Sequence, residues 1–237
     1  MTRFDDPEVV ARQYADEANL RARQALWANV EGENAAVVLR RALADLAPRR
    51  VLEVGGGQGE LAEWMQDELG AQVTFVDQSE RMVELARGRG IVDARVGDVQ
   101  ELPFADESFD TVVAAWMLYH VQDLDRALGE IARVLEPGGR LVAVTNSVRH
   151  LEELRAVFGT LMPEFERMFN AENAEERLTR HFSRVDRADT EIVAVVHDRE
   201  LLVAYRESLS YEALPVPEDI PLPFRVHGRA SVFVAAR

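Results

Sequence analysis

The sequence predicts a doubly wound α/β domain with a mostly parallel sheet. Short apolar runs rich in β-branched residues alternate with segments of helical periodicity, which is typical of parallel strands joined by helices. The first such run leads into a glycine-rich turn, Gly55 to Gly59, and a helical pattern begins directly behind it. A length of 237 residues, with 47% hydrophobic and 29% charged residues, suits a single domain of this class.

The expected strands follow one another along the chain. The first begins at Val51, and four more are expected at 71–76, 94–97, 111–115 and 140–144. Two later runs, 190–196 and 229–235, complete a sheet of seven strands. Leu135 to Gly139 contains one proline and two glycines, so we expect a turn before the fifth strand.

Helical patterns divide this single domain, residues 1–237, into three regions. Residues 1–47 hold two expected helices, one from the Asp5-Asp6-Pro7 start to about Trp27 and one from about Asn34 to Leu46. Residues 48–147 contain the glycine turn and the first five strands. Residues 148–237 begin with an expected helical insertion over 150–180, followed by the sixth strand, a helix over 200–209 and the last strand.

The spacing of the glycines decides between two kinds of cofactor. A dinucleotide fingerprint requires G-x-G-x-x-G. If Gly55 and Gly57 are its first two glycines, the third glycine should stand at position 60, but that residue is Glu60. Glu60 falls in the first helical turn, where its carboxylate competes with a pyrophosphate for the positive end of the helix. The pattern therefore favours a nucleoside cofactor that lacks phosphates.

The pattern Glu53-x-Gly-x-Gly-x-Gly59 resembles the first motif of class I S-adenosylmethionine-dependent methyltransferases. Further motifs follow in register: Val76-Asp77, Gly97-Asp98-Val99, Leu102-Pro-Phe and Leu135-x-Pro-Gly-Gly139. Within that class the chain looks most like the small-molecule group that contains ubiquinone, menaquinone and natural-product enzymes. The resemblance implies S-adenosyl-L-methionine as cofactor, a Rossmann-like methyltransferase fold with N-terminal lid helices, and an antiparallel last strand.

The resemblance also implies the residues that bind the cofactor. An acid about 20 residues after the glycine turn is placed to accept hydrogen bonds from a ribose diol, and Asp77 meets that condition. Glu53 is expected to reach the methionine amino group, the Ala115 carbonyl to bind the methionine ammonium, and Tyr14 to close over the sulfonium. The complete expected set is Tyr14, Glu53, Gly55, Gly57, Asp77, Gln78, Met82, Asp98, Val99 and Ala115, with Asp98 and Val99 at the adenine edge and Met82 on its face.

Tyr119 and His120 are the candidate catalytic residues, because they follow the fourth expected strand at the end that faces the site. Imidazole near its own pKa suits removal of a proton from a hydroxyl. Support of the turn at Val121 is an equally good interpretation of His120. His150, His181, Tyr205 and Tyr211 are weaker candidates for the lining of a substrate pocket. The five histidines show no paired spacing, so we expect no metal site.

Composition narrows the range of partners. The net charge of −15 argues against a nucleic-acid partner. All 27 basic residues are arginine, and this excludes a catalytic or phosphate-binding lysine. Cysteine is absent, and no apolar run reaches the length of a membrane span. We therefore expect a cytoplasmic protein without a membrane partner.

The expected function is methyl transfer to a small-molecule acceptor, with the oxygen, nitrogen or carbon nucleophile left open. Two alternatives come from other classes: a non-catalytic protein that binds the same cofactor, and a nicotinamide-dependent oxidoreductase, which the position of Glu60 disfavours. Methylation of a protein also stays open. Neither the acceptor nor the oligomeric state can be read from the sequence.

Overall fold

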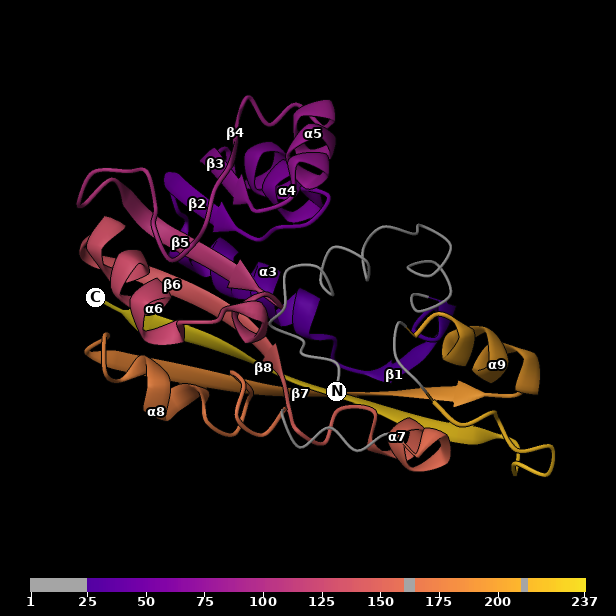
Figure 1. Ribbon diagram of the computed structural model, residues 1–237. Coiled ribbons are helices and arrows are strands. Elements are labelled where there is room, and N and C mark those ends of the chain that lie inside the picture. Colours follow the sequence, from indigo (N-terminus) through magenta and orange to yellow (C-terminus); the bar gives the residue numbers. More distant parts are fainter. Residues whose placement is uncertain (1–24, 160–164, 210–212) are drawn as a thin grey trace.

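The computed structural model describes residues 25–159, 165–209 and 213–237. Its centre is one sheet of eight strands in the order β1-β7-β8-β6-β5-β2-β3-β4 (Figure 1). The strands are β1 (Val30–Gly32), β2 (Arg50–Val54), β3 (Gln72–Asp77), β4 (Asp93–Val96), β5 (Phe109–Ala115), β6 (Leu135–Asn146), β7 (Arg184–Val196) and β8 (Phe224–Ala236).

The sheet confirms the α/β class and corrects the count of seven strands. Strands β2 to β6 pair in parallel, as expected. Strand β8 is antiparallel to both β6 and β7, and β1 adds an eighth strand antiparallel to β7. The three-residue β1 carries no periodicity that a sequence pattern can register, since it pairs along only Val30 to Gly32.

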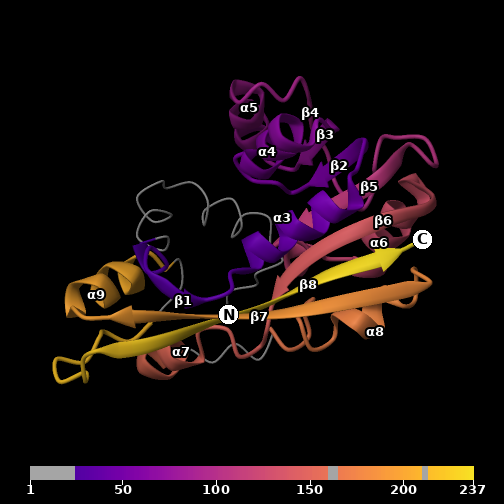
Figure 2. The same ribbon diagram turned by 180° about the vertical axis from the view of Figure 1, so that it is seen from behind.

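Helices cover both faces of the sheet (Figures 1 and 2). They are α3 (Ala35–Leu46), α4 (Glu60–Leu69), α5 (Glu80–Gly88), η1 (Leu118–His120), α6 (Leu124–Val134), α7 (Glu152–Phe158), α8 (Ala174–Leu178) and α9 (Arg199–Glu207). One apolar cluster packs α3, α4 and α5 against one face, and another packs α6 and α8 against the other face. The parallel strands are therefore buried on both sides, as a doubly wound sheet requires.

Local signals explain where the helices begin. Asn34, Ser79, Asp123 and Asp198 cap α3, α5, α6 and α9 through side-chain oxygens that accept backbone N–H groups. The second expected N-terminal helix is thus confirmed as α3. The first falls almost wholly on residues 1–24, outside the described ranges, as does Tyr14.

Two expected segments differ from the structure. Leu135 to Gly139, expected as a turn, belongs to β6. The pairing of β6 with β5 shifts its register between Phe109 and Thr111, and Gly138 has a positive φ of 81°. The expected helical insertion over 150–180 is helical only in α7 and α8 among its described residues. Its apolar residues are used as buried anchors instead, for example Phe169, which packs in the same cluster as α6.

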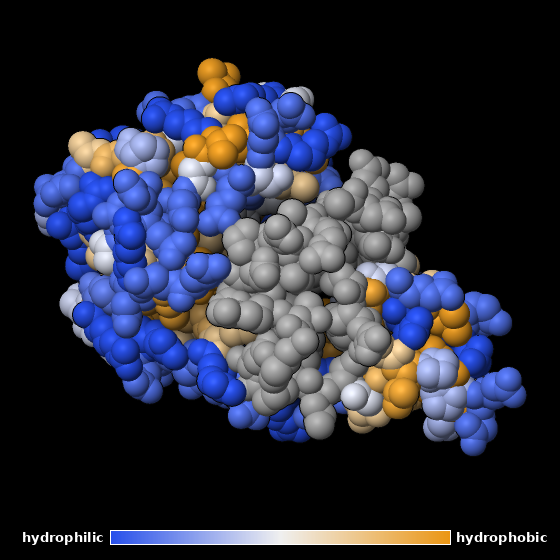
Figure 3. Space-filling model, viewed as in Figure 1, coloured by the Kyte–Doolittle hydropathy of each residue, from blue (hydrophilic) through white to orange (hydrophobic). Residues whose placement is uncertain are grey.

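Strands β7 and β8 extend beyond the edge of the sheet at which the parallel strands end. Asn146, the last residue of β6, pairs with Ala230, and β8 continues from there back to Phe224, which pairs with the end of β7. A third apolar cluster covers this extension with α7 and α9 (Figure 1). Hydrophobic side chains gather at its surface near α9, whereas hydrophilic residues dominate the rest of that face (Figure 3). No helix in the described part of the chain has the length and apolar character needed to cross a membrane.

Candidate functional site

The glycine turn joins β2 to α4 at the carboxyl edge of the parallel strands. Gly55, Gly57 and Gly59 have φ values of 62°, 58° and 79°, which side chains rarely tolerate. The Gly55 N–H donates to the Val76 carbonyl at 2.8 Å and ties the turn to β3. A Cβ at Gly55 or Gly59 would lie within 3.0 Å of a neighbouring side chain, whereas a Cβ at Gly57 would meet nothing within 4 Å. The turn is therefore packed on its inner side and open at Gly57.

Glu53 is the buried acid beneath this turn. Glu53 is 1% exposed, and its Oε2 has no hydrogen-bond partner in the described structure. Burial raises the pKa of Glu53 to about 8; the N–H of Ala62 opposes that rise, and the nearby charge of Asp77 adds to it. A buried carboxyl oxygen without a partner is costly, so this group is suited to receive a donor or a cation.

Asp77 ends β3 beside the same turn. Its Oδ1 accepts the Ser79 N–H at 2.8 Å, and the N–H of Gly57 also donates to the carboxylate. Burial raises the pKa of Asp77, while these two backbone hydrogen bonds oppose the rise. Gln78 is exposed next to it, and Met82 is partly buried in the first turn of α5.

Asp98 follows β4 and is held by Gln100, a residue that the sequence reasoning missed. The Gln100 backbone N–H donates to Asp98 Oδ1 at 2.8 Å, and its side-chain amide donates to both carboxylate oxygens. The Gln100 Oε1 accepts the Asp123 N–H at 2.9 Å, at the start of α6. Gln100 thus connects the loop after β4 to the loop after β5, while Val99 beside it is buried. Its place two residues after an acid is the only hint that the sequence offers.

The end of β5 brings the candidate catalytic residues to the same edge. After Ala115 the chain turns at Trp116 and enters η1, which holds Tyr119 and His120. The two rings meet edge to face with centroids 4.5 Å apart, and Phe165 lies 6.4 Å from the Tyr119 ring. Tyr119 and His120 are partly buried.

Adjacent parallel strands bring these residues to one edge. Strands β2, β3, β4 and β5 are neighbours, so Glu53, Asp77, Asp98 and Ala115 lie at or near their carboxyl ends, where ligands bind in open α/β sheets. Glu60 is the first residue of α4 and pairs with Arg89 at 3.2 Å, so a carboxylate does occupy the first turn of this helix. That observation agrees with the argument against a dinucleotide.

The weaker candidates lie elsewhere. Tyr205 is buried in the third apolar cluster, stacked on Phe158 with centroids 6.3 Å apart. His181 is partly buried, and its Nε2 lies 3.4 Å from Asp125 Oδ1. Tyr211 is outside the described residues. Tyr205 therefore belongs to the hydrophobic core, and the side chain of His181 contacts Asp125.

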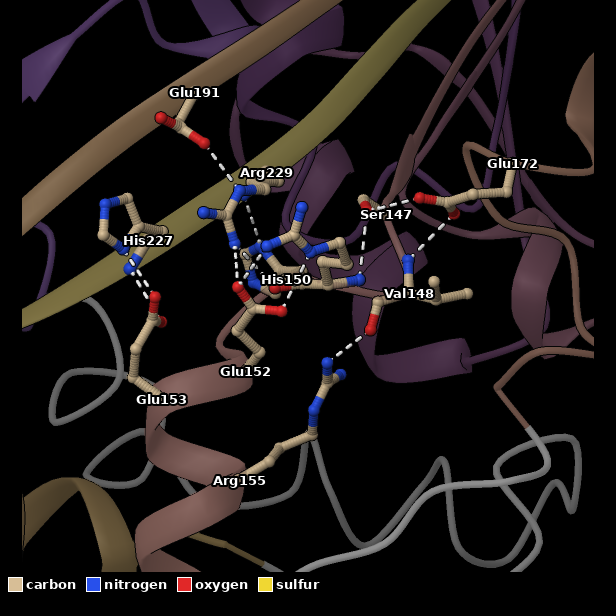
Figure 4. A network of polar contacts seen from close by, with 11 residues as sticks. Ser147, Val148, His150, Glu152, Glu153, Arg155, Glu172, Glu191, His227 and Arg229 are labelled. Carbon is tan, nitrogen blue, oxygen red and sulfur yellow. Dashed lines mark hydrogen bonds and ion pairs between the residues drawn. The ribbon is translucent and has the colours of Figure 1, made fainter.

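His150 belongs to a polar network beyond the end of β6 (Figure 4). Its Nδ1 accepts the Arg229 N–H at 3.1 Å, and burial, with the charge of Arg155, lowers its pKa to about 4. Arg229 also pairs with Glu152 at 2.9 Å and Glu191 at 2.5 Å (Figure 4). These contacts fasten α7 to β7 and β8. Among the described residues there is no cluster of His, Asp and Glu that could hold a metal ion.

Comparison with known proteins finds similarity to methyltransferases. Residues 52–143 match the family described as a methyltransferase domain. The methyltransferase GfsG of Streptomyces halstedii is 38% identical over 125 residues, which are 50% of this chain and 45% of that protein. The ubiquinone biosynthesis O-methyltransferase of Xanthomonas oryzae pv. oryzae is 44% identical over 107 residues, 43% of this chain and 44% of that protein. The matched region thus spans less than half of the length of each of these two relatives.

Solved structures extend the likeness to the whole fold. Phosphoethanolamine N-methyltransferase 2 of Haemonchus contortus, in complex with S-adenosyl-L-methionine, superposes with a TM-score of 0.62 at 21% identity. The superposition covers 100% of this chain and 60% of the Haemonchus contortus chain. At 21% identity this likeness shows the fold alone. Residues 52–143 thus match a methyltransferase domain, and the solved structure shares the fold of the chain.

Proposed function

We propose that this chain transfers the methyl group of S-adenosyl-L-methionine to a small-molecule acceptor. The observation that carries the proposal is the buried Glu53, whose Oε2 has no partner in the described structure, directly beneath a glycine turn that is open at Gly57. When bound, the cofactor supplies an activated methyl group on a positively charged sulfur. The site fits it, because the Glu53 carboxyl is ready for the amino group and Glu60 occupies the first turn of α4, where a phosphate would otherwise bind.

The proposed binding roles follow the strand ends. Glu53 and the Ala115 carbonyl receive the amino group of the cofactor, and Asp77, with Gln78 beside it, receives the ribose hydroxyls. Asp98 and Val99 border the adenine, and Met82 packs on its face. Gly55 and Gly57 let the cofactor approach the main chain. Tyr14, which lies outside the described residues, is proposed to close over the sulfonium.

His120 and Tyr119 are proposed to act on the acceptor. A hydroxyl nucleophile gains from losing its proton as the new bond forms, and imidazole is suited to accept that proton. An amine needs only its neutral lone pair. The protein otherwise contributes alignment of the two reactants and exclusion of water.

Calorimetric titration tests the proposed function. We expect S-adenosylmethionine and S-adenosylhomocysteine to bind, with dissociation constants between about 1 μM and 1 mM, and NADH to show no binding. Acceptor panels of phenols, alcohols and amines with radiolabelled cofactor then test turnover. The His120→Ala variant is expected to lose turnover of hydroxyl acceptors by about 100-fold or more and to keep that of amines. Absence of cofactor affinity contradicts the proposal, and binding without turnover favours the non-catalytic alternative.

Gly57→Ala tests the opening of the glycine turn. We expect the variant to fold and to lose cofactor affinity, because the added methyl group projects into the space left free in front of the turn. Gly70→Ala is the matched control: Gly70 has a similar φ of 65°, its added methyl group also meets nothing, and it ends α4 away from the turn. Both variants carry a similar backbone cost of about 1 kcal/mol. Equal affinity in the two would show that the cofactor does not approach Gly57.

A further inference from the structure

Trp116 adopts a backbone conformation that bulky residues rarely take. Its φ is 54°, and it directly follows Ala115 at the carboxyl end of β5. Left-handed conformations cost a residue with a Cβ free energy and persist where surrounding contacts hold them. The contacts of Trp116 therefore indicate what maintains this turn.

Two hydrogen bonds from Trp116 reach β6. Its backbone N–H donates to the Val144 carbonyl at 2.9 Å and continues the pairing of β5 with β6. Its indole Nε1 donates to Asn146 Oδ1 at 3.2 Å. Asn146 is the last residue of β6, so the ring of Trp116 is fastened to the end of the neighbouring strand.

The turn at Trp116 shapes the part of the site between β5 and the glycine turn. It brings Met117 against Gly55, where an added Cβ would lie 2.8 Å from Met117 Cβ. It also leaves the Ala115 carbonyl at the strand end and leads directly into η1, which holds Tyr119 and His120. The orientation of these groups thus depends on a backbone conformation that a side chain of β6 helps to hold.

Asn146 also fixes the chain on the acceptor side. Its main-chain carbonyl accepts the Ala171 N–H at 3.0 Å, and the neighbouring Thr145 donates its hydroxyl to the Phe169 main-chain carbonyl at 3.0 Å. The described part of this segment includes Phe165, whose ring centroid lies 6.4 Å from that of Tyr119. One residue therefore links the turn after β5 to the segment beside the candidate catalytic residues.

We propose that Trp116 and Asn146 form a positioning pair that holds the end of β5 for the amino-acid end of the cofactor. This inference rests on the proposed function, because it assumes that S-adenosylmethionine binds at this edge. It differs from a purely structural role in one respect. The pair acts on the part of the ligand next to Ala115, and it leaves binding of the nucleoside part unchanged.

The test compares two ligands, S-adenosylhomocysteine and adenosine, which lacks the amino-acid end. Asn146→Leu and Trp116→Phe each remove one side of the indole hydrogen bond. We expect each substitution to weaken the binding of S-adenosylhomocysteine by about tenfold. The double variant should bind this ligand no more weakly than either single variant, because both substitutions remove the same hydrogen bond. The affinity for adenosine should stay unchanged. Asn146→Asp keeps an acceptor oxygen and should restore wild-type affinity. Thr145→Val, which removes a hydrogen bond one residue away, is the matched control.

Nuclear magnetic resonance gives a second, independent measurement. The chain has three tryptophans, and the indole N–H signal missing from Trp116→Phe identifies that of Trp116. We expect this signal to shift on addition of S-adenosylhomocysteine and to exchange with solvent faster in Asn146→Leu. Equal losses for both ligands, or additive effects in the double variant, would overturn the positioning pair. A wild-type protein that binds neither ligand would instead overturn the proposed function.

Discussion

Replacement of Asp77 by alanine is expected to reduce the affinity for S-adenosylmethionine by about 100-fold or more while the domain stays folded. Asp77 ends β3 beside the glycine turn, and its carboxylate is proposed to receive both ribose hydroxyls. Hydrogen bonds to a charged group contribute about 1.5–3 kcal/mol each, and every 1.4 kcal/mol is a factor of ten in affinity. Calorimetric titration with S-adenosylhomocysteine measures the loss directly.

Two further variants separate this effect from a general disturbance of the turn. Asp77 also accepts the N–H groups of Ser79 and Gly57, so alanine removes local support as well as the ribose ligand. Asp77→Asn keeps one acceptor oxygen and is expected to retain more stability and part of the affinity. Asp93→Ala removes a carboxylate from the start of the neighbouring strand, where it contacts Thr74 and Arg95, and should leave binding unchanged. Unchanged binding in Asp77→Ala would show that the ribose assignment is wrong.

Local signals account for the parts of the fold that the sequence predicted well. The glycine turn, the position of Glu60 and the capping residues Asn34 and Ser79 each act within a few residues of their own place in the chain. Parallel pairing then follows from the alternation of strands and helices. For this reason the edge of the sheet that holds Glu53, Asp77, Asp98 and Ala115 could be predicted without coordinates.

The features that were missed depend on contacts between distant segments. Gln100 joins two loops, and Trp116 contacts Asn146 from 30 residues away. Strand β1 forms because β7 offers it a partner. Strand β7 begins six residues before the expected run 190–196, because β8 pairs with it along its whole length. No periodicity records such pairings, since each partner is an ordinary polar or apolar residue in its own segment. The unsatisfied oxygen of Glu53 likewise became visible only after packing was known.

Glu53 is expected to make the stability of the ligand-free protein depend on pH. Its pKa is about 8 in the folded protein and 4.5 in an exposed chain, so the folded state holds a proton that the unfolded state releases. The protonated carboxyl contributes to the free energy of unfolding. This contribution is complete below pH 4.5 and is lost as the pH rises to about 8. The loss is about 1.4 kcal/mol for each pH unit, or on the order of a few kcal/mol in all.

Glu53→Gln removes this titration, and we expect the variant to gain stability relative to the wild type across that pH range. Denaturant unfolding at several pH values measures the difference. Glu60→Gln is the control, because Glu60 is an exposed acid of the same helix–turn region and should leave the pH dependence intact. A wild-type protein whose stability relative to Glu53→Gln is the same at every pH would show that Glu53 titrates normally.

The same group links protons to the cofactor. A cationic amino group next to Glu53 favours the carboxylate and lowers its pKa. Binding at a pH between that lowered pKa and about 8 therefore releases a proton. Calorimetry in two buffers of different ionisation enthalpy counts that proton, and Glu53→Gln should abolish the release and weaken binding. If the wild type and Glu53→Gln released equal numbers of protons, Glu53 would not be the group that meets the cofactor's amino end.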